Sequence, residues 1–173
     1  PLLASTFAMH AASYKVSELA RENIRRIEEK EDFSLMGDVH ALLCGCKAFY
    51  SWEGADGINT CRLSCGGHGY SSYSGFTPLL NEFYVNCTHE GENTVMALQT
   101  ARYLIGSLTK LQKGEKIAQY ADYLIELPQL LEGKKCSAEK PEDFNLKLVY
   151  ETLKNIAISN VYTAANSLME GAQ

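Results

Sequence analysis

Residues that interrupt regular structure are scarce in this sequence, which has 4 prolines and 13 glycines among 173 residues. Because 46% of the residues are hydrophobic and only 21% are charged, the composition excludes collagen, low-complexity sequence and intrinsic disorder. No apolar run approaches the ~18 residues of a spanning helix, so no membrane contact is expected. Basic residues are also few: the sequence has 16 Lys and Arg against 21 Asp and Glu, which gives a net charge of −5. Nucleic acid is therefore not an expected partner, since phosphate binding needs a basic face.

The two ends of the chain are those of a segment rather than of a complete protein. The sequence begins with Pro1-Leu2-Leu3-Ala4, without a Met, a charged region or the apolar stretch of a secretory signal. It ends at Gln173 in a pattern typical of a helix, without a peroxisomal Ser-Lys-Leu tail. The length corresponds to about one domain of roughly 150 residues. We expect a piece of a longer protein.

The cysteines do not form a recognisable metal or disulfide pattern. They are Cys44, Cys46, Cys61, Cys65, Cys87 and Cys136. Zinc sites need closely spaced Cys and His pairs, and Cys61, Cys65 and His68 come nearest to that spacing. Cysteines in helical segments behave as small buried hydrophobic residues. We expect reduced thiols in an intracellular compartment and no metal site.

Apolar residues recur with the period of a helix along most of the chain. The pattern predicts helices over residues 2–30, 39–65, 77–86, 93–111, 115–126 and 144–170. Asp38 is expected to cap the second helix, and the Thr77-Pro78 pair to begin the third. No segment has a convincing strand pattern. The predicted fold class is all-α, an up-down helical bundle followed by additional helices.

The domain organisation follows from the same pattern. Residues 1–127 are expected to form a helical bundle domain, residues 128–143 a polar linker, and residues 144–173 the beginning of a further helical domain. Small residues crowd the interior of the second helix, including several glycines. Since each glycine costs a helix about 1 kcal/mol relative to Ala, we expect neighbouring helices to approach closely there.

Two loops contain residue types suited to cofactor binding or to catalysis. Gly66-Gly67-His68-Gly69-Tyr70 follows a helix, and its glycines would expose backbone N–H groups to a ligand such as a phosphate-bearing cofactor. Glu90-Gly91-Glu92-Asn93-Thr94 places two carboxylates at a helix start, where one could serve as a base. A purely structural interpretation is that the glycines end a helix and that Glu92 is a first-turn carboxylate stabilised by the helix dipole. Spacing alone favours this structural interpretation.

Longer stretches of the sequence resemble the peroxisomal acyl-CoA oxidases. The resemblance is carried by Gly66–Tyr70 and by the run from Glu90 to Arg102, EGENTVMALQTAR. Shorter matches are Pro1–Ala4, His40-Ala41-Leu42, Lys47-Ala48-Phe49 with Ser51-Trp52, and Gly57-Ile58 with Cys61-Arg62. Together they cover about residues 1–130. The resemblance implies a bundle like the C-terminal domain of the acyl-CoA dehydrogenase superfamily, with residues 1–127 carrying the base and the glycine turn.

This resemblance implies an FAD-dependent, homodimeric flavoprotein oxidoreductase of peroxisomal fatty acid β-oxidation. Such an enzyme converts fatty acyl-CoA to trans-2-enoyl-CoA and reduces molecular oxygen to hydrogen peroxide. By motif position Glu90 is the catalytic base and Gly91 contacts substrate. Gly66 and Gly67 match the glycine pair that lies against the FAD of a neighbouring subunit. Glu92, Asn93 and Thr94 match a stretch that contacts flavin, whereas His89 has no assigned role.

Two alternatives remain open at this point. One is an acyl-CoA dehydrogenase that passes electrons to a partner protein, although the Glu-Asn-Thr run after the base favours an oxidase. The other is a non-catalytic helical interaction domain. Because the N-terminal helical domain and the β-domain of the family are not in this chain, the isolated segment is expected to be colourless and inactive. Phe49 and Trp52 would then be partly exposed.

Overall fold

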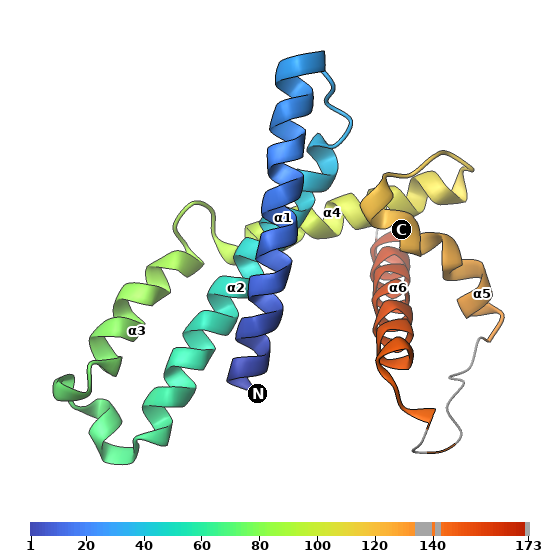
Figure 1. The fold of residues 1–173 in the computed structure, drawn as a ribbon. Helices are drawn as coiled ribbons and strands as arrows, with labels where there is room; N and C mark the ends of the chain where they lie inside the picture. The colour runs from blue at the N-terminus through green and yellow to red at the C-terminus, as the bar shows by residue number, and fades with distance from the viewer. Residues whose placement is uncertain (134–139, 141–142, 172–173) are drawn as a thin grey trace. The chain divides into compact units, whose positions relative to one another are not determined.

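The computed structural model describes residues 1–133, 140 and 143–171, and every regular element in these residues is helical (Figure 1). The predicted all-α class is confirmed. None of the described helices is long and apolar enough to cross a membrane. The chain forms two compact units, Pro1–Thr100 and Ala101–Gln173, which we describe separately. The domain boundary expected at residues 127/128 stays a prediction.

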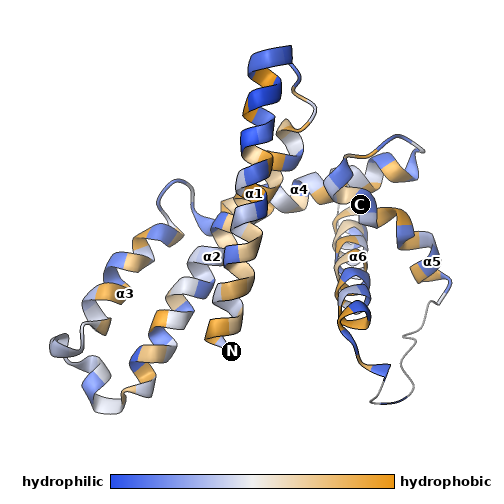
Figure 2. Ribbon diagram, in the orientation of Figure 1, coloured by the Kyte–Doolittle hydropathy of each residue, from blue (hydrophilic) through white to orange (hydrophobic). Residues whose placement is uncertain are grey.

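The first unit begins with two long helices. Helix α1 spans Leu2–Lys30, as predicted, and ends where Glu31 adopts a left-handed conformation with φ 53°. Hydrophilic residues dominate its C-terminal half (Figure 2). There Arg25 pairs with Glu22 and Glu29 at 2.9 and 3.0 Å. Such exposed pairs on one helix contribute only about 0.3–0.5 kcal/mol each, so they favour solubility more than stability.

Helix α2 spans Met36–Ser64 and starts earlier than predicted. The expectation that Asp38 caps this helix is wrong, because Asp38 lies within the first turn and is only 2% exposed. Leu35 occupies the N-cap position without a side-chain hydrogen bond. Leu35 and Val39 are both buried at this turn. Burial of apolar residues therefore determines where α2 begins.

Three glycines in the interior of α2 lie where neighbouring helices approach, as the sequence predicted. A Cβ on Gly45 would lie 3.1 Å from Thr100 Oγ1, and a Cβ on Gly54 would overlap the ring of Phe83. A Cβ on Gly57 would contact Leu2 at 3.5 Å. Each of these three glycines thus receives a side chain from a different helix, whereas Gly37 in the first turn has no such neighbour. The aromatic side chains expected on the open face of α2, those of Phe49 and Trp52, are 52% and 44% exposed.

The segment after α2 contains more helix than predicted. The expected loop at 68–77 includes two 3₁₀ turns, η1 (Gly66–Tyr70) and η2 (Ser72–Ser74). Helix α3 spans Phe76–Tyr84, and Gly75, with φ 75°, stands at its N-cap. The Thr77-Pro78 pair is therefore not the cap. Instead, Thr77 Oγ1 donates to Gly69 O at 3.3 Å and ties α3 to the glycine turn.

The last elements of the first unit lead to the second loop. The 3₁₀ turn η3 (Val85–Cys87) follows α3, and helix α4 spans Asn93–Gln112. The start and the end of α4 agree with the prediction to within one residue. Thr100 Oγ1 donates to Ala41 O at 2.8 Å, which joins α4 to α2.

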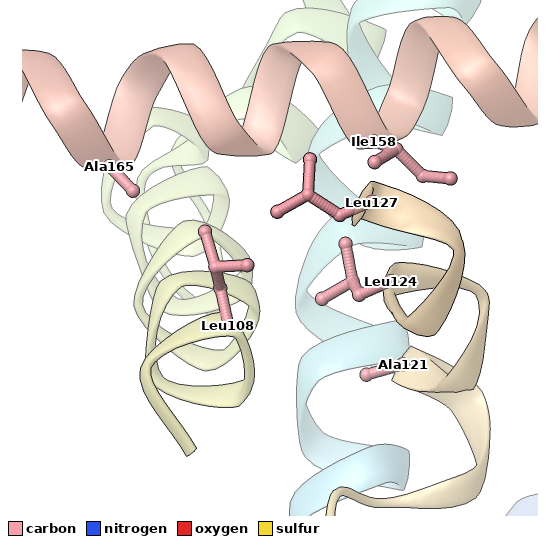
Figure 3. Close-up of a cluster of buried hydrophobic side chains, with 6 residues drawn as sticks. All are labelled: Leu108, Ala121, Leu124, Leu127, Ile158 and Ala165. Carbon is pink, nitrogen blue, oxygen red and sulfur yellow. The ribbon is translucent and has the colours of Figure 1, made fainter. Parts of the chain in front are cut away.

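The second unit has its own hydrophobic core (Figure 3). Its elements are the end of α4, η4 (Gln119–Glu126), α5 (Leu127–Leu131) and α6 (Leu146–Glu170). The core cluster comprises Leu108, Ala121, Leu124, Leu127, Ile158 and Ala165. The helix predicted at 115–126 is instead a 3₁₀ helix that starts at Gln119, because packing of Ala121 and Leu124 outweighs α-helical propensity. Asn145 caps α6 by accepting a hydrogen bond from Leu148 N at 3.0 Å.

Some predictions fall outside the described residues. Half of the polar linker predicted at 128–143 lies there, as does Cys136. The first residues of that predicted linker are helical instead, because α5 runs to Leu131. The other cysteines, all in the described part of the chain, are free. No group of His, Cys, Asp and Glu side chains among the described residues is arranged to hold a metal ion.

Candidate functional site

The glycine turn, Gly66–Tyr70, is held against the end of α2. Gly66 adopts a left-handed conformation with φ 57°, which stops the helix. Gly69 is buried, and a Cβ there would overlap the backbone carbonyl of Arg62. The Arg62 guanidinium lies 4.7 Å from the centre of the Tyr70 ring. The chain's own packing therefore requires glycine at position 69.

Gly67 has a different environment from Gly69. A Cβ on Gly67 would have no heavy atom within 4 Å, and the backbone φ is not in the left-handed region. Neither the turn nor the packing of the described chain explains why this residue is glycine. Gly66 is equally open. The outer surface of the turn can thus be approached closely by a molecule outside this segment.

The second loop, His89–Glu92, which we call the base turn, has an unusual backbone. Glu90 has φ 57°, one of only two non-glycine residues in the described chain with a positive φ. A non-glycine residue in this region costs on the order of 1–3 kcal/mol. Gly91 follows with φ 112°, and a Cβ on it would lie 2.7 Å from Met96 Cε. The sharp reversal at Glu90-Gly91 therefore depends on contacts that hold it.

Lys47 on α2 supplies the main contact. Its Nζ donates to the carbonyl oxygen of Gly91 and, at 2.7 Å, to Oδ1 of Asn93. Lys47 and Gly91 are 44 positions apart in the sequence. Hydrogen bonds from an ionised donor are roughly twice as strong as neutral ones. Lys47 thus fastens the base turn to the middle of α2.

Asn93, the first residue of α4, is 0% exposed. Its Nδ2 donates to Ala48 O at 3.3 Å and to Ser51 Oγ at 2.9 Å, and Ser51 Oγ also lies 3.1 Å from Asn93 Oδ1. With the Lys47 bond, both polar atoms of the Asn93 amide are engaged by α2. The side chain therefore anchors the N-terminus of α4 and faces the interior of the bundle.

Glu92 caps the same helix end from outside. Its Oε2 accepts hydrogen bonds from the backbone N–H groups of Thr94 and Val95 at 2.9 and 3.2 Å, and its Oε1 accepts one from Thr94 Oγ1 at 3.1 Å. The bond from the Thr94 amide lowers the pKa of Glu92 most, and the Val95 amide lowers it further. Because this pKa is depressed on folding, the cap stabilises α4 above the unfolded pKa. That stabilisation is lost as the pH falls through the folded value.

Glu90 differs from Glu92 in that its carboxylate makes no interaction with the described chain. No described residue forms a hydrogen bond or ion pair with it, and the side chain is exposed. It lines a shallow hollow of about 240 Å³ between α2, α3 and the base turn. The hollow is lined by Lys47, Tyr50, Ser51, Phe83, Asn86, His89 and Glu90. Of the two carboxylates in the motif, Glu90 is the one available to react.

The predicted site residues fall into two groups in the first unit. Glu90, Gly91, Glu92, Asn93 and Thr94 lie together on the base turn and the first turn of α4. Gly66 and Gly67 lie before α3, whereas the base turn follows it (Figure 1). The nine residues of α3 span about 14 Å at 1.5 Å per residue, so the two groups do not form one pocket within this unit.

The sequence interpretation missed the anchoring roles of Lys47 and Ser51. Both residues contributed to the family resemblance, yet no local pattern linked them to the base turn. Their partners lie more than 40 positions away, and only the packing of α4 on α2 brings them together. The only sequence signal for these roles was the spacing of Lys47 and Ser51, four residues apart, which places both side chains on one face of a helix.

Comparisons with known proteins identify the family to which this chain is similar. The family model for the acyl-CoA oxidase C-alpha1 domain matches residues 1–105. Human peroxisomal acyl-coenzyme A oxidase 1 is 43% identical over 131 residues, which cover 74% of this chain and 19% of that protein. Rat peroxisomal acyl-coenzyme A oxidase 2 is 37% identical over 158 residues, covering 88% of this chain and 22% of that protein.

The solved structures that resemble this chain are also acyl-CoA oxidases. Acyl-CoA oxidase 1 of Arabidopsis thaliana superposes with a TM-score of 0.88 at 32% identity, covering 97% of this chain and 26% of that one. Acyl-CoA oxidase-1 of Caenorhabditis elegans, complexed with FAD and ATP, superposes with a TM-score of 0.76 at 30% identity, covering 94% and 24%. The fold thus defines a helical domain of the kind found in acyl-CoA oxidases. The chain belongs to the acyl-CoA oxidase family, and it spans about a fifth of the length of the curated relatives that it matches.

Proposed function

We propose that this chain is the helical, base-carrying part of an FAD-dependent acyl-CoA oxidase. The whole enzyme would convert fatty acyl-CoA to trans-2-enoyl-CoA and reduce oxygen to hydrogen peroxide in peroxisomal β-oxidation. One observation carries the proposal: within the family-matched region, Glu90 presents an unengaged carboxylate on a strained turn beside a hollow. Glu92, the neighbouring carboxylate, is committed to capping α4.

Glu90 would act as the general base that removes the α-proton of the thioester. A carboxylate is a weak base in water, so the complete active site must exclude water around it. In this segment the Glu90 side chain is exposed. The missing enclosure would come from parts of the protein beyond this chain, which fits the expected inactivity of the segment alone. Gly91 would contact the substrate through its backbone, since Met96 fills the space that a Cβ there would take.

FAD, when bound, supplies the hydride acceptor and the route to oxygen. The residues present fit such a group, because the surface at Gly66 and Gly67 is open to close approach and position 67 has no other reason to be glycine. Thr94 is exposed at the start of α4 and could accept a hydrogen bond. Glu92 would contact the cofactor through backbone atoms, since its side chain caps α4. Asn93 is 0% exposed in this chain, so it would support the cofactor site by anchoring the start of α4.

The proposed enzyme is a homodimer, as the family resemblance implies. Gly66 and Gly67 lie the length of α3 from the base turn and do not share its hollow, which is compatible with the two groups serving different copies of the cofactor. This supports the proposal that the glycine turn contacts the FAD of a neighbouring subunit. The exposed aromatic side chains of Phe49 and Trp52 offer apolar surface for the rest of the enzyme to cover.

The reaction of the full-length enzyme with oxygen tests the proposed activity. Mixing it with a fatty acyl-CoA without oxygen should bleach the flavin absorbance, and admitting air should restore the colour with stoichiometric hydrogen peroxide. A reduced enzyme that reoxidises only with an electron-transfer protein would indicate a dehydrogenase instead. A full-length protein without flavin would indicate a non-catalytic helical interaction domain.

We expect Gly67→Val to lower FAD retention in the full-length enzyme while leaving the stability of the domain within about 0.5 kcal/mol. The added side chain would occupy the open surface without meeting any atom of this chain. FAD per subunit is measured by absorbance after desalting, and stability by thermal unfolding of the apoprotein.

Gly69→Ala is the matched control for this prediction. A Cβ at Gly69 overlaps the Arg62 carbonyl, so this variant should lose stability by about 1–3 kcal/mol. If Gly67→Val retained full FAD, the turn would serve only to stop the helix.

A further inference from the structure

Lys47 places a positive charge at a helix N-terminus, where a cation is not expected. Its ammonium lies at the N-terminus of α4, bonded to Gly91 O and Asn93 Oδ1. A helix N-terminus carries a partial positive charge that favours anions and disfavours cations. After the Thr94 and Val95 amides, the Lys47 charge is a smaller cause that lowers the pKa of Glu92, the residue that caps α4. The hydrogen bonds of Lys47 go to the Asn93 side chain and to the backbone at Gly91.

The backbone that Lys47 holds belongs to the base turn, which sets the direction of the Glu90 side chain. Two consecutive residues, Glu90 and Gly91, have positive φ values of 57° and 112°, and glycine can rotate freely at such a position. Hydrogen bonds on both sides restrain the turn. His89 N donates to Val85 O at 2.7 Å before it. After it, Lys47 holds the Gly91 carbonyl, and the Glu92 carboxylate accepts from the Thr94 and Val95 amides.

We propose that Lys47 is a positioning residue for the proposed base, which it orients by fixing the Gly91 carbonyl relative to α2. This inference rests on the proposed function of Glu90. The Lys47 ammonium carries three donors on one atom, and it bridges the turn and the first residue of α4. The Lys47 side chain is itself half-buried and starts from the rigid middle of α2. The direction of the Glu90 side chain is thereby coupled to the bundle.

The test uses the full-length enzyme with Lys47→Met, which removes every donor. A misplacement of about 1 Å at a reacting group can lower turnover on the order of 10²-fold. We expect kcat to fall by about that factor with KM little changed, because substrate contacts elsewhere remain. FAD content should equal that of the wild type. Lys47→Arg keeps the charge and the donors, so it should recover part of the loss.

A second readout follows proton removal without turnover. An acyl-CoA analogue with sulfur in place of the β-carbon can lose an α-proton but has no β-hydride to transfer. Exchange of its α-deuterium into solvent, measured by mass spectrometry, reports the base alone. We expect this exchange to slow in Lys47→Met by the same factor as kcat.

Thr100→Val separates positioning from stability. It removes another hydrogen bond between α4 and α2, Thr100 Oγ1 to Ala41 O, and does not touch the base turn. It should lower the melting temperature and leave both kcat and exchange unchanged. Equal effects of the two variants on kcat at equal loss of stability would overturn the positioning role.

The outcomes distinguish this inference from the proposed function. Normal kcat and exchange in Lys47→Met, with Glu90→Gln inactive, would overturn the inference and leave the base assignment intact. Activity in Glu90→Gln would overturn the assignment itself. If Lys47→Met does not fold, Lys47→Gln carries the same test, because its shorter neutral side chain cannot reach both acceptors. Wild-type exchange in that variant would likewise overturn the inference.

Discussion

Glu90→Gln in the full-length enzyme should leave FAD bound and lower turnover by about 10²–10⁴, the contribution of a positioned general base. Glutamine has nearly the same shape as glutamate but cannot accept the α-proton. The structure gives no second reason for an effect, because the Glu90 carboxylate bonds to no described residue and is exposed. Stability should therefore change by less than about 0.5 kcal/mol. Steady-state oxygen consumption and flavin absorbance measure the two quantities.

Glu82→Gln is the matched control, since Glu82 is an exposed carboxylate on α3 and does not line the hollow. Its kinetics should match those of the wild type. If Glu90→Gln kept comparable turnover, Glu92 would be the next carboxylate to test. Its carboxylate is engaged in capping bonds that lower its pKa, so we expect the loss to be found at Glu90.

Asn93→Leu should lower the free energy of unfolding by about 3 kcal/mol or more, because a buried group left without its partner costs about 1–3 kcal/mol. Leucine fills a similar volume but offers no hydrogen bond. The Lys47 ammonium, the Ser51 hydroxyl and the Ala48 carbonyl would each lose a bond. The Lys47 ammonium is half-buried and keeps its bond to Gly91 O, so its loss is that of one charge-assisted hydrogen bond.

Thermal unfolding followed by circular dichroism checks this second prediction on the full-length enzyme. Asn81→Leu serves as the control, because Asn81 is an exposed residue on α3 and should change stability by less than about 0.5 kcal/mol. A small loss in Asn93→Leu, similar to that of the control, would mean that Lys47 and Ser51 find other partners. The network would then contribute little to holding α4 on α2.

Helix positions could be predicted well where the signal is local. The bounds of α1 and α4 followed from apolar periodicity and from the breaks at Gly91 and Gly114. The start of α2 could not be predicted from its best capping residue, because burial of Leu35 and Val39 overrode Asp38. Similarly, Gly75 displaced Thr77 as the cap of α3. In both cases a tertiary contact outweighed a local preference of about 1 kcal/mol.

The sequence alone determined the all-helical class, the crowding of small residues on α2 and the two loops that carry the candidate chemistry. These features depend on periodicity, residue size and local motifs, which the order of residues encodes directly. The tertiary structure decided how the motif residues divide their roles. It commits Glu92 to a helix cap and Asn93 to the interior, leaves the Glu90 carboxylate open, and brings Lys47 onto the Gly91 carbonyl. These roles depend on the packing of α4 against α2 across more than 40 positions of sequence, and no local pattern specifies such a contact.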